Sequence, residues 1–528
     1  MLENSSVHEA GLSVQDQRIA DRGSSVLIEK VFGPPGTGKT TYLLNVVEQE
    51  LSGGTDPKKI GYFSFTRKAS YEARDRAMSK FPFLNMKTDF PYFRTLHSLA
   101  FHVLGTRSED MMKPEHYREF AQECGIEINV SAADDVPSAK ADNPILNQIN
   151  LARIRGVDLH KHYNDSNLDI EWHHFEFVER SYRQYKYKNY LLDFTDLLEL
   201  VALEPHRLPS LDAVIVDEAQ DLSTLQWKIV EELASRSKRL YIAGDDDQAL
   251  FTWAGADVNS FINFQGKVRI LDKSYRVPSA VHELAKNIVE RIKTRQPKSW
   301  ESRDFAGQVS FYHDIQDIDM SSGEWLVLAS TNYLLDPVHG MLKGSGLLFE
   351  RNHIPSIHPS TARSIIEWER LRKGGKIPGD AVVALYKLLD SSSVARGHKT
   401  FKNGDVDGLY TAADLAAEHG LKFDPQDLPI WHEALVKIPS DKVQYIIAML
   451  RRGTRITDPA RIRLSTIHGA KGGECDNVVL LLDLSPLFAK EYARNADDVN
   501  RLFYVGVTRT KRHLHLIMPK HSEKGFRL

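Results

Sequence analysis

A glycine-rich stretch near the start of the chain has the residue types and spacing needed to hold phosphate groups. The pattern G-x-x-x-x-G-K-[ST] is matched by Gly33, Pro34, Pro35, Gly36, Thr37, Gly38, Lys39 and Thr40. Glycines allow backbone N–H groups to curl around phosphate oxygens, and the positive end of a following helix adds attraction. We expect Lys39 to neutralise the β- and γ-phosphates of a nucleoside triphosphate, while the Thr40 hydroxyl binds Mg²⁺.

Two adjacent carboxylates, Asp217 and Glu218, supply the second half of such a site. The apolar run at 213–216 predicts a short strand that ends at this pair. One carboxylate can be held by the metal while its neighbour stays available as a base. We therefore expect Asp217 to contact the water shell of Mg²⁺ and Glu218 to activate the attacking water.

Short apolar stretches alternate with helical patterns around these motifs. Strands are expected at 26–32, 60–65, 213–216, 240–243, 308–312, 325–329, 462–466, 478–482 and 513–517. A second alternating region is expected to begin near Val268. This alternation predicts an α/β fold with parallel sheets.

Two long segments interrupt the alternation and are interpreted as inserted, mainly helical domains. The long separation between Lys39 and Asp217 agrees with the first of them. The expected division is a first motor lobe at 1–101 and 191–265 with its insertion at 102–190, and a second lobe at 266–354 and 456–528 with its insertion at 355–455.

The overall composition has no strong charge bias. The 528 residues carry 68 Lys+Arg and 71 Asp+Glu, a formal net charge of −3, so a nucleic-acid site must be a local patch. Two cysteines exclude a disulfide framework and a four-cysteine metal site within the chain. No apolar run approaches the ~18 residues that span a membrane, and the N-terminus has no signal-peptide pattern. We expect a soluble cytoplasmic protein without membrane contact.

The stretch 244–256, GDDDQALFTWAGA, resembles the third motif of the UvrD/Rep branch of superfamily 1 helicases. It includes Trp253, which separates this branch from the RecD/Dda-like one. Further matches follow the family's order, at 65–69, 95–97, 193–198, 274–276, 466–474 and 504–509. The resemblance implies two RecA-like P-loop lobes with parallel sheets, each with a mainly helical inserted domain, and ATP in the cleft between the lobes.

The resemblance also implies roles for residues around the nucleotide. Gln248 would sense the γ-phosphate, and Arg276 and Arg509 would reach it from the second lobe to stabilise the transferring phosphoryl group. Tyr275 would stack on the adenine, and Glu474 would bind the ribose. Surface ion pairs for the arginines, core packing for Tyr275 and a solvated carboxylate for Glu474 stay open as alternatives.

Two positions concern the contacts to adenine: one matches the family's pattern only in residue type and spacing, and the other departs from it. Gln17 lies sixteen residues before Gly33, where an adenine-reading glutamine is expected, but its surroundings match poorly and an exposed helix residue is the alternative. Thr41 stands where many relatives have an arginine that packs on the base. We therefore expect looser adenine contacts than in those relatives.

Candidate contacts to a nucleic-acid strand come from both lobes. Flat side chains can stack on unpaired bases, and hydroxyl and imidazole groups can donate to phosphate oxygens. The expected contacts are Phe65, Thr66, Thr95, His97, Trp253, Asn332, Thr466 and His468. The repeated Thr-x-His in the two halves supports this interpretation, and core packing is the alternative for the aromatic residues.

Each of three basic segments has two possible interpretations, a nucleic-acid contact or a solvated surface. They are 180–188, with interleaved tyrosines, 451–463, with five arginines and one acid, and a tip with Arg396, His398, Lys399 and Lys402. The duplex-binding Gly-Ile-Gly hairpin of many relatives is not recognisable in the second insertion. Fewer sequence features therefore support duplex unwinding than support ATP hydrolysis.

The resemblance implies an ATP-dependent DNA helicase that uses ATP and Mg²⁺ and moves 3′→5′ along a single strand. Expected partners are single-stranded DNA and single-strand/duplex junctions, with replication or repair proteins as further candidates, and the enzyme is expected to act as a monomer. A DNA-stimulated ATPase that remodels protein–nucleic-acid complexes without sustained unwinding, or an RNA-acting motor, stays open. A fused nuclease is not expected, because few residues follow Arg509.

Overall fold

The computed structural model describes residues 26–64, 67–82, 84–129, 143–166, 168–399, 401 and 405–528. The chain forms two compact units and passes between them more than once. The first contains residues up to Val277 together with Lys286–Phe305 and Ala496–Tyr504. The second contains Pro278–Ala285, Ala306–Asn495 and Val505–Leu528.

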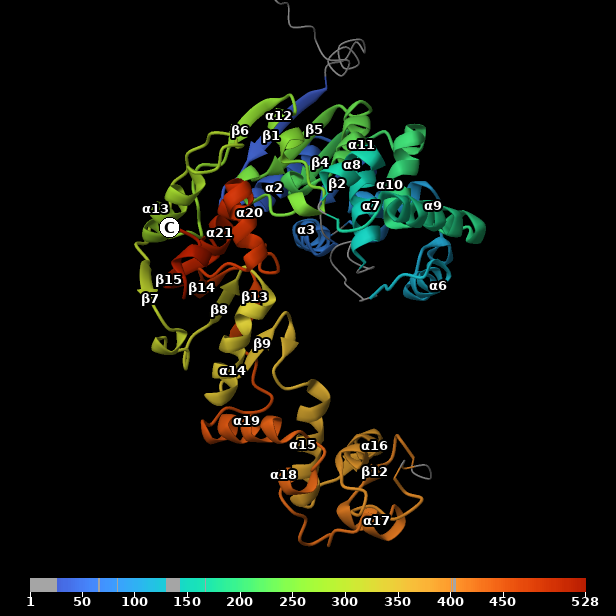
Figure 1. Cartoon of the computed structure of the whole chain (residues 1–528), viewed down its shortest axis with the longest axis vertical. Helices are drawn as coiled ribbons and strands as arrows, with labels where there is room; N and C mark the ends of the chain where they lie inside the picture. The colour runs from blue at the N-terminus through green and yellow to red at the C-terminus, as the bar shows by residue number, and fades with distance from the viewer. Residues whose placement is uncertain are drawn as a thin grey trace, which may run out of the picture. The chain divides into compact units, whose positions relative to one another are not determined.

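A six-stranded sheet of order β3-β2-β4-β5-β1-β6 forms the centre of the first unit (Figure 1). The strands are β1 Leu27–Phe32, β2 Ile60–Ser64, β3 Phe93–Arg94, β4 Ala213–Asp217, β5 Arg239–Gly244 and β6 Lys267–Ile270. Every neighbouring pair is parallel. The predicted α/β class with parallel sheets is therefore confirmed.

The edge strand β6 corrects one detail of the sequence interpretation. The alternating pattern of the second region was expected to begin near Val268, but this residue pairs with Lys30 of β1 in the first sheet. An ion pair between Arg269 and Glu29 joins the same two strands. The cross-strand contacts, which a linear pattern does not display, decide which sheet this strand joins.

Helices cover both faces of the first sheet. On one face, α2 Lys39–Ser52 packs Leu43 and Val47 against the strands. The other face is covered by α5 Leu96–Val103, α10 Phe194–Leu203, α11 Thr224–Ala234 and α12 Val258–Asn263. α3 Arg67–Lys80 and α4 Met86–Asp89 follow β2. Burial on both faces explains why the central strands β2 and β4 are almost continuously apolar.

Four further helices of the first unit form a core of their own. They are α6 Pro114–Cys124, α7 Pro144–Arg155, α8 Leu159–Asp165 and α9 Trp172–Asn189. Phe120 and Phe175 lie at the centre of this core. Lys186 of α9 donates to Asp193 and Asp196 at 2.6 Å, so a buried ion-pair network joins these helices to the start of α10.

The second unit is built on a seven-stranded sheet of order β10-β9-β13-β8-β14-β15-β7. The strands are β7 Gln308–Tyr312, β8 Trp325–Ala329, β9 Phe349–Arg351, β10 Ile354–Pro355, β13 Ile462–Thr466, β14 Cys475–Leu481 and β15 Thr510–Ile517. All pairs are parallel except β10 with β9. α14 Asp336–Gly344 follows β8, and α20 Pro486–Arg494 follows β14.

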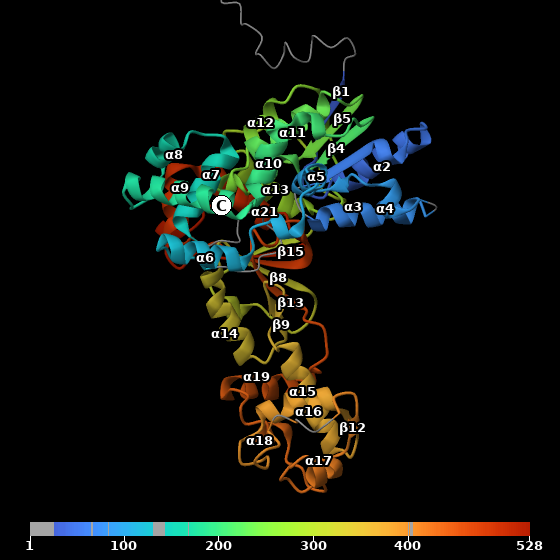
Figure 2. The same ribbon diagram turned by 90° about the vertical axis from the view of Figure 1, so that its right-hand side faces the viewer.

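A mainly helical segment continues the core of the second unit. It comprises α15 Pro359–Arg372, α16 Gly379–Leu388, α17 Ala412–Glu418, α18 Trp431–Ala434, α19 Ser440–Arg451 and the short pair β11 Ile377–Pro378 and β12 Leu409–Tyr410. Figure 2 shows α15 to α18 grouped away from the sheet strands. Val327, Trp368 and Tyr445 belong to one continuous apolar core that joins sheet and helices.

Two helices contribute residues to both units, α13 Ser279–Val289 and α21 Ala496–Val507. Cys124 and Cys475 are free thiols. Within the described ranges, no helix combines the length and the apolar character needed to cross a membrane.

Candidate nucleotide and nucleic-acid sites

The loop between β1 and α2 has the shape that its glycines permit. Gly36 and Gly38 adopt φ angles of 72° and 82°, which residues with a Cβ rarely take. A Cβ on Gly33 would lie 2.0 Å from Cγ of Lys39, so the lysine packs where a side chain would be. The Lys39 ammonium donates to the Gly33 carbonyl oxygen at 2.7 Å, which places its charge at the loop. The predicted phosphate-loop residues thus lie together between a strand and a helix.

β4 delivers Asp217 to the same edge of the sheet. This carboxylate is 3% exposed and accepts from the Tyr62 hydroxyl at 2.8 Å and from the Glu218 backbone N–H at 2.9 Å. Burial, followed by the charge of Glu218, raises the pKa of Asp217 to about 6, and the nearby charge of Lys39 opposes this rise. The left-handed φ of 53° at Glu218 is strain of the kind that accumulates at functional sites.

A hydrogen-bonded chain connects Glu218 to Gln248. The Gln220 amide donates to Glu218 Oε2 at 2.5 Å, and its carbonyl oxygen accepts from the Asp245 backbone N–H at 3.0 Å. The Gln248 amide in turn donates to Asp245 Oδ2 at 2.6 Å. These bonds join the carboxyl ends of β4 and β5. Gln220 and Asp245 therefore link the two residues predicted from the sequence, Glu218 and Gln248.

Three consecutive carboxylates after β5 are balanced by cations of the chain itself. Asp245, Asp246 and Asp247 are buried, and their oxygens lie 3.3, 2.6 and 2.5 Å from the Lys298 ammonium, which is fully buried too. Arg295 donates to both carboxylate oxygens of Asp247 at 2.8 Å. This cluster is an internal ion-pair network.

The segment with Tyr275 and Arg276 is bonded to the phosphate loop. The Tyr275 backbone N–H donates to the Gly36 carbonyl oxygen at 2.8 Å, and the Ser274 hydroxyl donates to the Pro35 carbonyl oxygen at 2.7 Å. The Tyr275 ring is 74% exposed. These bonds place Arg276 beside the phosphate loop, in the last residues of the first unit before the chain enters the second at Pro278.

Glu474 and Arg509 belong to the second unit. Glu474 is exposed and lies 3.6 Å from the Lys511 ammonium. Arg509 is 2% exposed and donates to the backbone carbonyl oxygens of Val505 at 3.0 Å and Gly473 at 3.3 Å. The structure therefore brings Arg509 close to the backbone that precedes Glu474.

The two Thr-x-His sequences form the same local turn in different units. The Thr95 hydroxyl accepts from the Ser98 backbone N–H at 3.2 Å, and the Thr466 hydroxyl accepts from the Gly469 backbone N–H at 3.1 Å. Each threonine lies at the carboxyl end of a strand, and its histidine follows two residues later with a half-buried ring. The internal echo in the sequence thus corresponds to a repeated structure.

The remaining predicted strand contacts fall into two groups. Trp253 is 60% exposed, and Asn332 lies exposed just after β8, where its side-chain oxygen accepts from the Asn352 amide at 3.0 Å. Thr41 of the nucleotide site is also exposed. Outside the described residues lie Gln17, Phe65, Thr66 and Lys402.

The basic segment at 180–188 is only partly available to a ligand. Tyr182 and Tyr185 are buried, and Lys186 is paired with aspartates, whereas Tyr187 and Lys188 are exposed. Alternation of tyrosine and basic residues in the sequence therefore reflects two faces of α9.

Three residues that support the site were not predicted from the sequence. Lys298 and Arg295 lie about fifty positions after the acids that they bind, and Tyr62 lies in β2, far along the chain from Asp217. No short motif contains these partners. A polar residue inside an apolar strand, such as Tyr62, is the one local signal that was available.

Comparison with known families covers both halves of the chain. Residues 15–269 match the UvrD/REP helicase N-terminal domain, and residues 441–521 match the UvrD-like helicase C-terminal domain. The chain belongs to the UvrD/Rep-like family of superfamily 1 helicases. Membership implies that the two parallel-sheet units are RecA-like lobes.

Similar curated proteins include three that are named ATP-dependent DNA helicase PcrA. The protein of Bacillus subtilis (strain 168) is 25% identical over 322 residues, which cover 55% of this chain and 41% of the relative. Those of Staphylococcus aureus (strain Mu50 / ATCC 700699) and Staphylococcus epidermidis are 23% and 24% identical, each over 55% of this chain and 42% of the relative. The chain thus spans about two-fifths of the length of these relatives.

Proposed function

We propose that this UvrD/Rep-like chain is an ATP-dependent motor that moves 3′→5′ along single-stranded DNA and opens duplex at single-strand/duplex junctions. The observation that carries the proposal is the meeting of Lys39, Asp217 and Glu218 at one edge of the first sheet, with Lys39 close enough for its charge to oppose the rise in the pKa of Asp217. The names of the PcrA relatives support DNA as the substrate.

ATP and Mg²⁺ fit the residues present. The glycine turn offers backbone N–H groups beside the Lys39 ammonium, and the raised pKa of Asp217 indicates a buried carboxylate without a full counter-charge. In our proposal Thr40 and Asp217 hold Mg²⁺, and residues 33–41 with Tyr275, Glu474 and Gln17 hold the nucleotide. When bound, Mg²⁺ neutralises charge on the phosphate oxygens.

The chain's own residues then act on the attacking water and on the developing charge. Glu218, oriented by Gln220, takes a proton from water, and Gln248 reports on the γ-phosphate through its bond to Asp245. Arg276 and Arg509 supply positive charge to the transferring group, an effect of about 10³–10⁵ in rate for such arginines.

The DNA strand is proposed to lie on contacts from both units. Trp253 and Phe65 stack with bases, while Thr66, Thr95, His97, Asn332, Thr466 and His468 meet the sugar–phosphate backbone. The exposure of Trp253 and the repeated threonine turn support this assignment. We further propose that residues 102–190 and 355–455 are insertions in the two lobes. The enzyme is proposed to act as a monomer.

The proposal is tested by measuring ATP hydrolysis with single-stranded DNA or RNA, together with strand displacement on 3′- and 5′-tailed duplexes. We expect stimulation by DNA and displacement on the 3′-tailed substrate. Lys39→Ala and Glu218→Gln should both abolish turnover, the second with retained nucleotide binding, while Lys58→Ala at an exposed lysine leaves turnover unchanged. Hydrolysis without displacement favours a remodelling ATPase, and wild-type turnover in Glu218→Gln removes the base assignment.

A further inference from the structure

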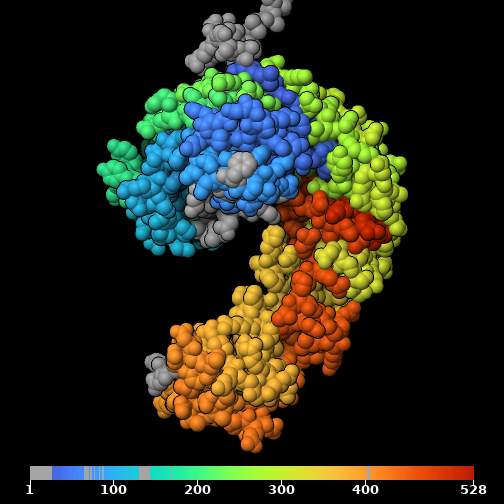
Figure 3. Space-filling model, turned by 180° about the vertical axis from the view of Figure 1, so that it is seen from behind, coloured from blue at the N-terminus to red at the C-terminus, as the bar shows by residue number. Residues whose placement is uncertain are grey.

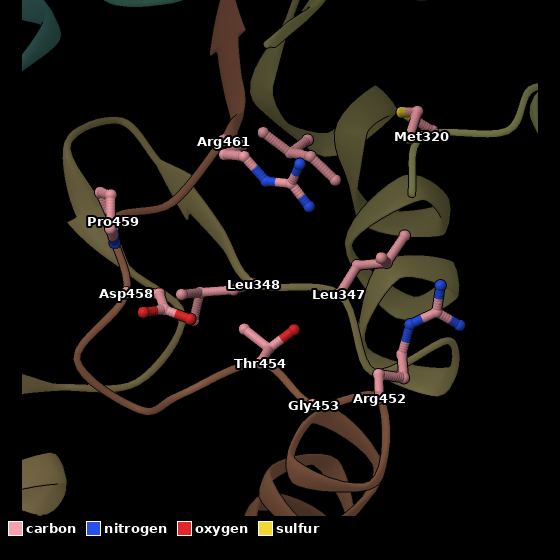
Figure 4. A pocket seen from close by; sticks show the side chains of 10 residues that line it. Met320, Leu347, Leu348, Arg452, Gly453, Thr454, Asp458, Pro459 and Arg461 are labelled. Carbon is pink, nitrogen blue, oxygen red and sulfur yellow. The ribbon is translucent and has the colours of Figure 1, made fainter. Parts of the chain in front are cut away.

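The second unit contains a pocket that the proposed motor cycle does not use. Its volume is about 380 Å³, and it lies where α19 ends, beside the segment before β9 and the start of β13 (Figure 4). The space-filling view shows the segments near 345 and near 455 on one continuous surface of this unit (Figure 3). Ile462 begins β13 at the pocket, whereas Thr466 ends that strand, so the proposed DNA contact lies at its other end.

The pocket combines an apolar floor with a cationic rim. Leu347 and Leu348, both half-buried, line the floor, and Arg452 and Arg461 line the rim from opposite sides (Figure 4). The Arg461 guanidinium donates to the Ser321 carbonyl oxygen at 2.8 Å. Within the part of the chain that the structure describes, neither Arg452 nor Arg461 has a carboxylate in ion-pair contact. Hydrogen bonds from Ser321 lower the pKa of Asp319, Arg452 lies near enough for its charge to lower this pKa further, and Asp458 lines the same pocket. These two acids offset the positive charge of the rim only in part.

The surrounding sequence strengthens this charge. Residues 451–463 contain five arginines and one acid in a chain whose net charge is −3. The acid, Asp458, also lines the pocket, and it accepts from the Arg455 backbone N–H at 2.8 Å within a turn. Arg463 donates to the Glu474 carbonyl oxygen and is directed elsewhere. The remaining arginines give this surface a local excess of positive charge that an anionic partner complements.

The shape of the pocket favours a peptide over a nucleic acid as that partner. A sugar–phosphate backbone satisfies arginines but has no apolar side chain to cover two leucines. An acidic peptide with a leucine or phenylalanine satisfies both parts, because its carboxylates pair with guanidinium groups and its side chain excludes water from the floor. A volume near 380 Å³ lies within the range of pockets that bind small ligands or single anchoring side chains.

We propose that this pocket binds a short acidic segment of a partner protein, with one large apolar side chain over Leu347 and Leu348 and carboxylates against Arg452 and Arg461. The site would recruit the chain to a protein rather than grip DNA. It makes no use of the nucleotide site, so binding does not require turnover.

The test measures fluorescence anisotropy of a labelled peptide, four aspartates followed by Leu-Pro-Phe, with the full chain. We expect saturable binding that weakens at least tenfold in Arg452→Glu and in Arg461→Glu. A matched control, Arg451→Glu, reverses an exposed arginine of the same stretch that does not line the pocket, and it should weaken binding less than threefold. A peptide with asparagines for aspartates, and one with alanines for Leu and Phe, should each bind at least tenfold more weakly.

Several results would overturn this proposal. These are absence of saturable binding up to about 1 mM peptide, equal binding by the asparagine or alanine peptide, and equal loss in the Arg451→Glu control. A labelled oligothymidine whose affinity falls in Arg452→Glu and Arg461→Glu while the peptide affinity does not would assign the surface to nucleic acid. Loss of ATP hydrolysis in Lys39→Ala should leave peptide binding unchanged, so failure of the motor proposal and failure of this one are separable.

Discussion

Two acidic clusters follow neighbouring strands of the first unit's sheet, and their negative charges are balanced differently. After β5, Asp245, Asp246 and Asp247 surround Lys298, and Arg295 adds a second cation. After β4, the carboxylate of Asp217 accepts from two uncharged donors, which are its only hydrogen-bond donors among the described residues, and the Lys39 ammonium donates to a backbone carbonyl oxygen. The Asp245–Asp247 cluster carries its counter-charge within the fold, whereas the pKa of Asp217 is raised to about 6 because burial outweighs the nearby charge of Lys39.

The difference shows why closeness of carboxylates does not by itself mark a metal site. Oxygens of Asp245, Asp246 and Asp247 all lie within 4.8 Å of one another, as metal ligands would. Yet the charges of these acids raise the pKa of Lys298 despite its burial, so the lysine stays protonated in the position that an ion would take. Asp217 has fewer neighbouring carboxylates than these three acids, but among the described residues it has no ion pair like the ones that they form with Lys298.

The largest effect should follow removal of the internal cation. Lys298→Ala leaves three buried carboxylates without their shared partner and should lower the free energy of unfolding by about 3–5 kcal/mol at pH 7. With Lys298 present the pKa of Asp246 is already raised to about 6, mainly by burial, and removal of the lysine, whose charge lowers it, should raise this pKa further. Protonation therefore relieves the repulsion in the variant as the pH falls. The loss should therefore shrink as pH falls from 7 to 5. Urea unfolding at both pH values measures it, and a loss below 1 kcal/mol would contradict the internal-cation assignment.

The sequence predicted the parts of this region that depend on neighbours along the chain. Lys39 and Thr40 sit in a continuous motif, and Asp217 ends an apolar run, so spacing alone located them. Lys298 was missed because its partners lie about fifty residues earlier and only the folded chain brings them together. Bonds from Ser274 and Tyr275 to the phosphate loop, which no linear pattern displays, fix the place of Arg276 beside that loop.

A second prediction concerns Asp247, whose carboxylate accepts two hydrogen bonds from Arg295. Asp247→Asn replaces one acceptor oxygen of the Arg295 fork by an amide and should cost about 2–3 kcal/mol of unfolding free energy at pH 7. Burial opposes ionisation of Asp247, but Arg295 and Lys298 more than offset it and lower its pKa. Its ionised form therefore stabilises the fold above the unfolded pKa near 4 and loses this effect at lower pH. Urea unfolding from pH 7 to 3 should show the two proteins converging, and a constant difference would count against the ion pair.

Divalent cations should distinguish the clusters more finely. In the presence of a non-hydrolysed ATP analogue, Mg²⁺ at about ten times its Kd should raise the unfolding free energy of the wild type by about 1.4 kcal/mol. Asp246→Asn should retain this gain, because Lys298 already occupies the Asp245–Asp247 cluster, whereas Asp217→Asn should lose it. Thermal unfolding with and without EDTA measures both. An equal gain in all three proteins would place the metal elsewhere.

The smallest stability effect should come from Asp217→Asn, although this change removes the carboxylate that is proposed to hold Mg²⁺. The asparagine oxygen can accept from the Glu218 N–H, and its amide can donate to the Tyr62 hydroxyl oxygen, which keeps both contacts but reverses the second, so the Tyr62 hydroxyl proton needs another acceptor. The change also removes a buried charge that the fold does not neutralise, so unfolding free energy at pH 7 should stay within about 1 kcal/mol of the wild type, or rise. ATP turnover should nevertheless fall by at least tenfold. A variant as destabilised as Asp247→Asn would show that Asp217 is structural, and the contrast between the two acidic clusters would disappear.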